Sequence, residues 1–587
     1  MVATLTLGLL ARPTSAQNIT TGTLSGVVAD QQGAVLPGVT VTANHEPTGT
    51  KYEGISGGDG RYQLPNVRVG GPYTVTATLS GFRDKTESGV NVALGEDRTV
   101  DFKLSLASVS ESVTVIGAVP VIDTSRAGTA ANISQEVIEN LPTIQRSIFD
   151  FARTSSFVNA SADAAGNDTS ISIAGRNNRY NNMQIDGAVN NDVFGIPVAG
   201  VPGGQTGSQP ISLDAIQEVQ VVVAPYDVRQ GGFSGGAVNA VTKSGTNAFS
   251  GTGYWVGRNE SLIGKIPAIA TTAVPDPPDS KIGAFKDQQG GFSLGGPILH
   301  NKAFFFGNLD LARKSTPVGF SADGSSGQTW GGVNAAGVPA HLADIQQVVS
   351  ISKSLYGYDP GPLGEVTTPT DADKIFIRTD FNFSSRNQLT ARINYVNSSR
   401  QLTTNGVPAT TAYAFPYDYY TAEEKVFSPV VQLNTTFAHA FNEFRFAYTR
   451  DRFGRNNPGL QLFPYVRVDF PDGLNVRLGT ENSSHANKLN QDIIELTDDV
   501  TWIKGKHTIT LGTHNELFHF WNLFIQNLYG QWEFFSIQNF QAGLAQFYSH
   551  GFSNTADPQQ PAGDQPERHA RDRHPAGQGR RCIPHAG

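Results

Sequence analysis

The sequence predicts an all-β protein built from several domains. Its 587 residues exceed what one ordinary hydrophobic core accommodates. Charged residues make up 16% of the chain, below the roughly 25% of typical soluble domains, whereas the 63 glycines exceed the usual share of about 7%. With 34 phenylalanines, 17 tyrosines and no long apolar run after the N-terminus, this composition is typical of extended β-structure.

The first sixteen residues have the pattern of a secretory signal peptide. Residues 5–10 are apolar and small residues follow up to Ala16, but the basic segment that normally precedes the apolar core is missing. We therefore expect the true start to lie upstream of Met1 and cleavage to follow Ala16. The alternative is a hydrophobic N-terminal strand.

Residues 22–106 predict a small β-sandwich. Apolar and threonine residues alternate over residues 73–79, so that such a strand has one buried face. Glycine-containing turns, such as the one at residues 57–62, separate short strands at regular spacing. A linker at residues 107–131 follows, which contains a short apolar segment at 110–118.

Residues 132–244 predict a second domain of mixed structure. A helical turn opens it, with Ile133, Val137 and Leu141 on one face ahead of a proline. Two short strands around an asparagine-rich turn come next. The glycine- and proline-rich loop at residues 195–210 either faces a ligand or is disordered.

The run at residues 214–247 closes this second domain and is its most informative part. Four valines in residues 217–223 predict a strand buried on both faces, and a second apolar strand follows at 238–243. Four glycines lie between these strands and allow two backbones to approach where side chains would collide. They are Gly231, Gly232, Gly235 and Gly236.

Residues 245–556 predict part of an antiparallel β-barrel that spans a membrane. Ile375 and Ile377 alternate with Phe376 and Arg378, so that one face would meet lipid and the other a polar lumen. Further hairpins are predicted within residues 431–448 and 496–513. The dense aromatic residues at 518–552 predict strands that carry an interfacial girdle.

Residues 557–587 break this pattern. They have no aromatic residue and no alternation, and they contain five arginines, three histidines and the only cysteine, Cys582. A disordered basic tail is one interpretation. We favour a frameshift near Ala562, because the change is abrupt and interrupts the barrel.

Several functional classes are excluded. A net charge of −8 gives no basic surface for nucleic acid, and one cysteine permits neither a disulfide framework nor a cysteine-based metal cluster. The Gly-x-Ser-x-Gly pattern at Ser56, Ser234 and Ser293 lies in glycine-rich β context each time, without the strand-to-helix turn of a nucleophile elbow. We expect no catalytic residue, no cofactor and no metal site.

The order of these elements resembles the TonB-dependent outer-membrane receptors. Residues 171–187, which run from Ile-Ala-Gly-Arg to Ile-Asp-Gly, and the run at 214–247 resemble the plug domain of that family. The sandwich resembles the carboxypeptidase-regulatory-like module that often precedes a plug. Residues 290–310 resemble the early barrel of the Oar-like branch.

The resemblance implies two groups of functional residues. The plug motif would comprise Gly175, Arg176, Asp186, Gly187, Gly231, Gly232, Gly235 and Gly236, with Arg176 and Asp186 ion-paired inside the plug or to the barrel wall. TonB would pair as an added strand with Glu111, Ser112, Val113, Thr114 and Val115. An equally good alternative makes residues 111–116 an edge strand of the sandwich or the plug.

The resemblance also implies a function, a subcellular location and a set of partners. It implies a transporter of the bacterial outer membrane, with a periplasmic N-terminal domain, that takes up a scarce nutrient such as a glycan, a peptide or a metal chelate. Its partners would be TonB with its inner-membrane complex, the barrel-assembly machinery and outer-membrane lipid. The alternative function is a surface-exposed or secreted protein that uses the sandwich for adhesion or carbohydrate binding.

The barrel region is short for this family. Barrels of such transporters have about 22 strands, and residues 245–556 supply roughly half of them at 9 to 11 spanning residues each. Open sheet edges leave backbone groups that hydrocarbon cannot satisfy. We therefore expect this chain to be a non-functional fragment that does not insert as a working transporter.

Overall fold

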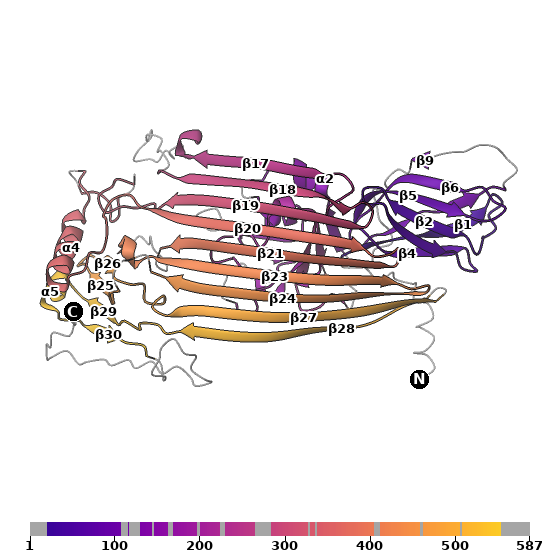
Figure 1. Cartoon of the computed structure of the whole chain (residues 1–587). Helices are drawn as coiled ribbons and strands as arrows, with labels where there is room; N and C mark the ends of the chain where they lie inside the picture. Colours follow the sequence, from indigo (N-terminus) through magenta and orange to yellow (C-terminus); the bar gives the residue numbers. More distant parts are fainter. Residues whose placement is uncertain are drawn as a thin grey trace.

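In the computed structural model, a sandwich lies at one end of a long β-sheet, a plug lies against that sheet, and a small cap lies at the other end (Figure 1). The structure describes residues 20–106, 115–116, 129–143, 146–162, 168–195, 200–223, 229–264, 283–326, 329–334, 337–403, 411–457, 459, 462–504 and 507–552. No helix in this described part is long and apolar enough to cross a membrane.

The N-terminal sandwich has two sheets that bury one face each, as the alternation predicts. The first sheet contains β4 (Arg61–Val67), β1 (Gly22–Asp30), β7 (Asp97–Thr99) and β8 (Phe102–Leu104). The second has the order β3 (Thr50–Ile55), β2 (Thr40–His45), β5 (Gly70–Thr78), β6 (Lys85–Val92) and β9 (Val115–Ile116). Leu24, Val75 and Phe102 lie in the core between them.

The plug is built on one five-stranded sheet. Its order is β10 (Thr129–Ile133), β15 (Ile216–Val223), β16 (Gly236–Thr242), β13 (Asn182–Ile185) and β14 (Ala188–Val189). The remaining elements are α2 (Gln135–Asn140), α3 (Ile148–Ala152), the hairpin of β11 (Val158–Ala162) and β12 (Asp168–Ile173), and two 3-10 turns, η2 (Asn178–Tyr180) and η3 (Leu213–Ala215). Every residue of β16 is buried, which confirms the strand predicted after the glycines.

The helical turn at the start of the plug differs from the prediction in its buried face. Ile133 lies in β10 rather than in a helix, and Val137 and Leu141 are exposed. The residue of α2 that packs inward is Ile138. The prediction was wrong because Ile133 pairs with Val219 of β15. The strand β10 therefore includes Ile133, and the helix begins only at Gln135.

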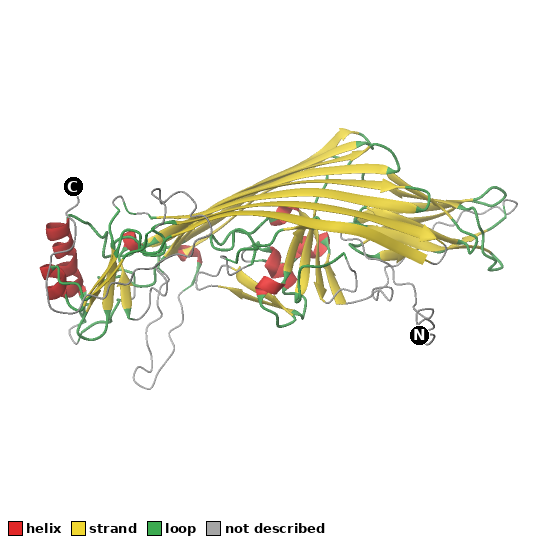
Figure 2. Ribbon diagram, turned by 90° about the horizontal axis from the view of Figure 1, so that it is seen from below, coloured by secondary structure: helices red, strands yellow, loops and turns green. Residues whose placement is uncertain are grey.

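The long sheet, called the wall below, consists of nine antiparallel strands. Their order follows the chain: β17 (Ser250–Asn259), β18 (Lys286–Leu299), β19 (Ala303–Pro317), β20 (Thr367–Asn382), β21 (Asn387–Leu402), β23 (Tyr420–Thr436), β24 (Ala440–Asn456), β27 (Asn487–Lys504) and β28 (His507–Phe524). Figure 2 shows the wall arching over the plug. Within the described residues, the outer edges of β17 and β28 have no partner strand, so the barrel is not closed.

The two faces of the wall alternate as predicted. Ile375 and Ile377 of β20 are 41% and 50% exposed on the outer face, whereas Phe376 between them is 1% exposed and joins the plug core. The predicted hairpins are confirmed, with Val431 opposite Phe446 and Leu496 opposite Asn515. The outer face therefore has the apolar character of a lipid-facing surface.

The two ends of the wall are different. Turns of three or four residues, such as 300–302 and 383–386, lie at the sandwich end, and long connections, such as 318–366 and 457–486, lie at the other. Short periplasmic turns and long extracellular loops are typical of outer-membrane barrels. We therefore take the sandwich end as the inner end and the opposite end as the outer end.

The long connections at the outer end fold into a cap with its own core. Its sheet has the order β22 (Ala412–Ala414), β26 (Asn475–Leu478), β25 (Tyr465–Asp469), β29 (Gln531–Phe534) and β30 (Phe547–Ser549). The helices α4 (Leu342–Tyr356) and α5 (Ile537–Ala542) contribute to its core, and the short turns η4 (Glu260–Leu262) and η5 (Pro416–Asp418) belong to the same end.

The cap corrects the prediction for the aromatic residues at 518–552. Phe518 and Phe520 lie on β28, the last wall strand. Phe534 and Phe540, by contrast, are fully buried in the cap core and cannot belong to an interfacial girdle. Aromatic density alone did not distinguish a lipid-facing strand from a soluble core, since both are rich in these residues.

Three predictions fall on segments outside the described residues. These are the signal peptide at 1–16, most of the linker at 107–131, and the tail at 557–587 with its proposed frameshift. They stay predictions.

Candidate functional site

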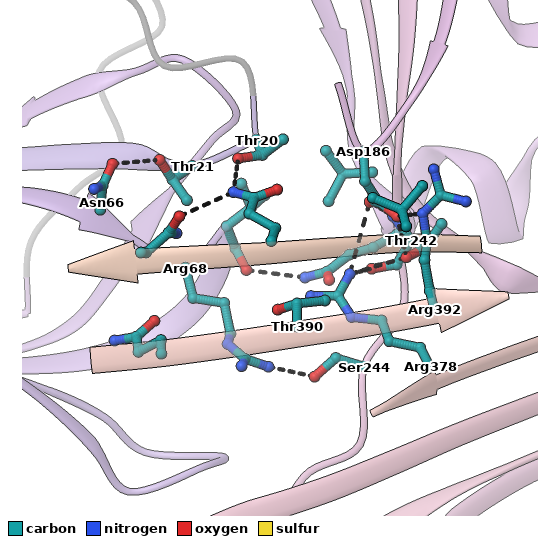
Figure 3. Close-up of a pocket in the computed structure, with 17 residues that line it drawn as sticks. Thr20, Thr21, Asn66, Arg68, Asp186, Thr242, Ser244, Arg378, Thr390 and Arg392 are labelled. Atoms are coloured by element: carbon teal, nitrogen blue, oxygen red, sulfur yellow. Dashed lines mark hydrogen bonds and ion pairs between the residues drawn. The ribbon is translucent and has the colours of Figure 1, made fainter. Parts of the chain in front are cut away.

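Sandwich, plug and wall meet at the inner end around a small polar cavity (Figure 3). Its volume is about 60 Å³. The sandwich contributes Asn66 and Arg68, the plug contributes Asp186 and Thr242, and the wall contributes arginine, glutamine and asparagine side chains. A space of this size and polarity accommodates a few water molecules, so it is a contact region of three domains rather than a ligand chamber.

Five charged side chains form a row across this junction. Arg68 of the sandwich lies 3.4 Å from Asp380 of β20, which also pairs with Arg378 at 2.8 Å. Arg378 in turn lies 3.6 Å from Asp186 of the plug. The row ends at Arg392 of β21, whose Nε is 2.8 Å from Asp186.

Asp186 is held in place by the local structure of the plug. It occupies the turn between β13 and β14 with φ of 48°, and Gly187 follows with φ of 73°. Its carboxylate accepts hydrogen bonds from the backbone N–H of Thr242 at 2.8 Å and from its hydroxyl at 2.9 Å. The neighbouring strand β16 therefore orients the carboxylate toward the wall.

The alternation of charge permits the row to be buried. Asp186 is 6% exposed, Asp380 is fully buried and Arg392 is 4% exposed. A buried charge without a partner is strongly unfavourable, and removal of one partner from a buried pair typically costs about 3–5 kcal/mol. Each of the two carboxylates contacts two arginines, so the loss of any member leaves a neighbour poorly compensated.

The sandwich is also fastened to the plug by hydrogen bonds outside this row. Leu94 donates its backbone N–H to Glu218 of β15 at 3.1 Å, and Gln217 donates to the carbonyl of Val69 at 3.0 Å. Arg68 donates to the hydroxyl of Ser244. The sandwich therefore closes the inner end of the plug and shares the ion-paired row with the wall.

One histidine of the sandwich titrates far from its ordinary range. Burial, helped by the nearby Arg68 guanidinium, lowers the pKa of His45 to about 3. His45 shares a hydrogen bond of 2.7 Å with the hydroxyl of Thr48 and is 5% exposed. It is therefore neutral at physiological pH.

The structure separates the four glycines that follow β15 into two pairs. A Cβ on Gly235 would lie 2.1 Å from Oδ1 of Asn181, and one on Gly236 would lie 2.5 Å from Ile173 and 2.6 Å from the carbonyl oxygen of Val222. A Cβ on Gly231 would meet nothing within 4 Å, and Gly232 has open space but a φ of 78°. Close backbone approach thus explains only Gly235 and Gly236.

The other predicted site residues lie apart from the junction. Gly175, with φ of 74°, and Arg176 form an exposed turn after β12, and the guanidinium of Arg176 makes no ion pair with another described residue. Of the proposed TonB contacts, Glu111, Ser112, Val113 and Thr114 lie outside the described residues. Val115 belongs to β9, which pairs in parallel with β6 at the edge of the sandwich.

Sequence reasoning missed most of the junction. It assigned Arg378 to the inward face of a strand but did not connect it with Asp186, about two hundred residues earlier. Nothing in the sequence distinguishes Arg68 from a surface arginine. The signal that the sequence offered was a pair of opposite charges at alternate positions of one strand. A protein rarely buries a charge without a partner, so such a pair indicates an ion-paired contact.

Three family matches follow one another along the chain. Residues 23–105 match the carboxypeptidase regulatory-like domain, and residues 120–238 match the TonB-dependent receptor plug domain. Residues 241–323 and 361–571, about half of the chain, match the outer membrane beta barrel domain. The last match reaches into the segment after residue 557.

A curated relative is the TonB-dependent transporter Oar of Myxococcus xanthus, 29% identical over 291 residues, which are 48% of this chain and 26% of that protein. Among solved structures, the outer membrane transporter YddB from Escherichia coli aligns over 72% of this chain and 51% of its own, with a TM-score of 0.48 and 14% identity. The siderophore receptor PirA from Pseudomonas aeruginosa aligns over 68% and 49%, with a TM-score of 0.40 and 13% identity.

This chain therefore spans about a quarter of that curated relative and about half of these solved chains. The assignment rests on the family matches and on their order, which agrees with the sandwich, plug and wall of the structure. The chain belongs to the TonB-dependent receptors of the bacterial outer membrane, in a form with an N-terminal carboxypeptidase regulatory-like domain.

Proposed function

We propose that the protein to which this wall belongs takes up a scarce nutrient across the outer membrane, with energy supplied by TonB. The observation that carries this proposal is the ion-paired fastening of Asp186 to Arg378 and Arg392. A plug that fills the concave face of the wall blocks passage, and its buried ion pairs hold it there. Uptake then requires work on the plug from the inner side.

The sheet order of the plug suggests where that work is applied. The first plug strand after the linker is β10, which lies at one edge of the sheet and pairs only with β15 in the described residues. A pull on the linker would reach β10 first and separate it from β15 one pair of residues after another. TonB contact at Glu111, Ser112, Val113, Thr114 and Val115 is part of this proposal.

The sandwich sits where such a movement must pass. Because Arg68 shares the row with Asp380, and Val69 and Leu94 bind the plug, the sandwich and the plug would leave the inner end together or in sequence. The peptide, glycan and metal-chelate classes of nutrient all remain candidates. Outer-membrane lipid and the barrel-assembly machinery complete the proposed partners.

The open edges of the wall bear on what this chain does by itself. Within the described residues, the outer edges of β17 and β28 each present a row of unpaired backbone groups that hydrocarbon cannot satisfy. We expect transport from a wall completed by further strands, and not from the nine strands alone. We assign no enzymatic activity to any part of the chain.

The test is TonB-dependent depletion of nutrients. Cells that express the receptor with a completed wall are incubated with a mixed peptide and oligosaccharide digest, and the medium is followed by mass spectrometry in tonB-positive and tonB-negative hosts. We expect one compound class to disappear only when both receptor and TonB are present. Equal depletion without TonB, or recovery of the receptor in the soluble fraction, contradicts the proposal.

The second candidate, adhesion or carbohydrate binding by the sandwich, has no specific observation in its favour in the described residues. The same fractionation distinguishes it, because a freely soluble receptor excludes transport and leaves a binding role.

A further inference from the structure

A group of buried oxygens lies on the inner face of the wall toward the outer end. Glu424 of β23 is 2% exposed, and Asp451 of β24 and Gln491 of β27 are each 3% exposed. Each has a buried oxygen with no hydrogen-bond partner: Oε2 of Glu424, Oδ1 of Asp451 and Oε1 of Gln491. Three adjacent strands thus present unpartnered acceptors at one level of the wall.

The strand register brings these side chains together. Asp451 lies directly opposite Gln491, and Glu424 is opposite Phe453, two positions from Asp451 on the same face. Nε2 of Gln491 donates to Oδ2 of Asp451 at 2.9 Å. The amide nitrogen of Gln491 therefore faces the aspartates, and its carbonyl oxygen is the third buried oxygen without a hydrogen-bond partner.

The plug closes the group from the other side. Nε2 of Gln491 also donates to Oδ1 of Asp192, in the plug segment after β14, at 3.2 Å. The backbone of Gly203, in the long plug loop, approaches Glu424. The oxygens therefore lie between the plug and the wall.

No ion pair joins Glu424 or Asp451 to a lysine or arginine among the described residues. Arg452, next to Asp451, pairs instead with Asp492 at 2.7 Å, and Arg455 lies 4.4 Å from the ring centroid of Tyr420. Two carboxylates buried together without a counter-charge are costly, and buried charges are usually paired. Such a pair is relieved either by a proton held on one carboxyl or by a positive group from outside the described chain.

We propose that this group, called the acceptor site, binds an ammonium group of the transported nutrient. An ammonium group has three N–H donors and no acceptor, which matches the three unpartnered oxygens of the acceptor site. A metal ion fits less well, because the described residues contain no group of three or more His, Cys, Asp or Glu side chains that could hold one. The proposal deepens the proposed uptake by naming the chemical class of the nutrient as a cationic amine.

The direct test is a calorimetric titration of the full 587-residue chain, folded in detergent micelles, with pentane-1,5-diamine. We expect saturable binding, at least tenfold weaker in Glu424→Gln and in Asp451→Asn. Glu423→Gln is the matched control, since it removes the same charge one residue away on the exposed outer face and should bind as the parent chain does. Tetramethylammonium, which has the charge but no N–H donor, should not bind.

The remaining outcomes of the titration contradict either the acceptor site or the proposed function. Absence of saturable binding to the parent chain overturns it whether or not the variants fold, and so does undiminished binding by both variants. Tighter binding of calcium chloride than of the diamine would replace the ammonium with a metal ion. Diamine binding without TonB-dependent uptake would contradict the proposed function and leave the acceptor site standing. TonB-dependent uptake without diamine binding would contradict the acceptor site and leave the proposed function standing.

Discussion

At the scale of single residues, Asp186 is the residue on which the fastening of the plug depends most. It receives two hydrogen bonds from Thr242 and two arginine contacts from the wall, so one carboxylate joins β16 of the plug to β20 and β21. An Asp-Gly turn supplies the backbone shape for this position. The arginines supply the charge that permits burial.

We expect Asp186→Ala to destabilise the attachment of the plug by about 3–5 kcal/mol, because it leaves Arg392 and Arg378 buried without their shared partner. The measurement is urea unfolding of the chain in micelles, followed together with protease cleavage of the plug. Glu136→Ala, at an exposed site of α2, is the control and should change little. An effect of Asp186→Ala as small as that of the control would show that the row does not hold the plug.

The glycines at the start of β16 and just before it allow a matched comparison. Gly236→Ala places a Cβ within 2.6 Å of the Val222 carbonyl oxygen and should cost about 1–3 kcal/mol through overpacking. Gly231→Ala meets open space and should be neutral or stabilise by up to about 1 kcal/mol, because the unfolded chain loses freedom. Thermal unfolding of the two variants side by side checks this, and equal effects would refute the close-approach explanation.

His45 gives the sandwich a predictable pH dependence. It is the only histidine between residues 20 and 106. Because burial lowers its pKa to about 3 in the folded state, the unfolded state takes up the proton first as pH falls below about 6.5. Stability should therefore be complete above pH 6.5 and fall by roughly 2–3 kcal/mol between pH 6.5 and 4.5.

This dependence can be measured on residues 20–106 alone, since every member of the sandwich core lies within that range. Urea unfolding at pH 7, 6, 5.5 and 5 gives the slope, and His45→Gln should abolish it over this window. A parent slope equal to that of the variant would mean that His45 is not buried as described.

At the scale of elements, the long plug loop shows why position cannot be predicted from composition. Its glycines and prolines allowed either a ligand-facing or a disordered loop. The described part, from Gly200 onward, is largely buried against the wall, where the hydroxyls of Thr206 and Ser398 lie 2.6 Å apart and Asn394 donates to the carbonyl of Pro210. The loop is thus a second fastening point between plug and wall.

That contact predicts a cross-link. With Cys582→Ser as background, the pair Thr206→Cys and Ser398→Cys should form a disulfide on mild oxidation, since their Oγ atoms already lie in contact. Thr206→Cys with Thr390→Cys is the control, because Thr390 lies eight residues away along β21, or about 26 Å of strand. Mass spectrometry of tryptic peptides detects the link, and equal linking in both pairs would place the loop elsewhere.

At the scale of the whole molecule, the strands and their buried faces were predictable from the sequence, and the contacts between residues far apart in the chain were not. Alternation over residues 375–383 gave the correct face for Phe376 and Arg378, because the side chains of a strand alternate strictly. The same alternation cannot say that Arg378 meets Asp186, since that depends on how the wall curves around the plug. The cap was missed for the same reason, because its core gathers residues from 320 to 548 that are far apart in the chain.

The central claim is that the plug must move relative to the wall for uptake to occur. The most direct measurement combines the Thr206→Cys and Ser398→Cys pair with TonB-dependent nutrient depletion, in a receptor whose wall is complete. We expect uptake to stop when the disulfide forms and to return when a reductant opens it, while the control pair takes up nutrient under both conditions. Undiminished uptake with the disulfide intact would contradict the account.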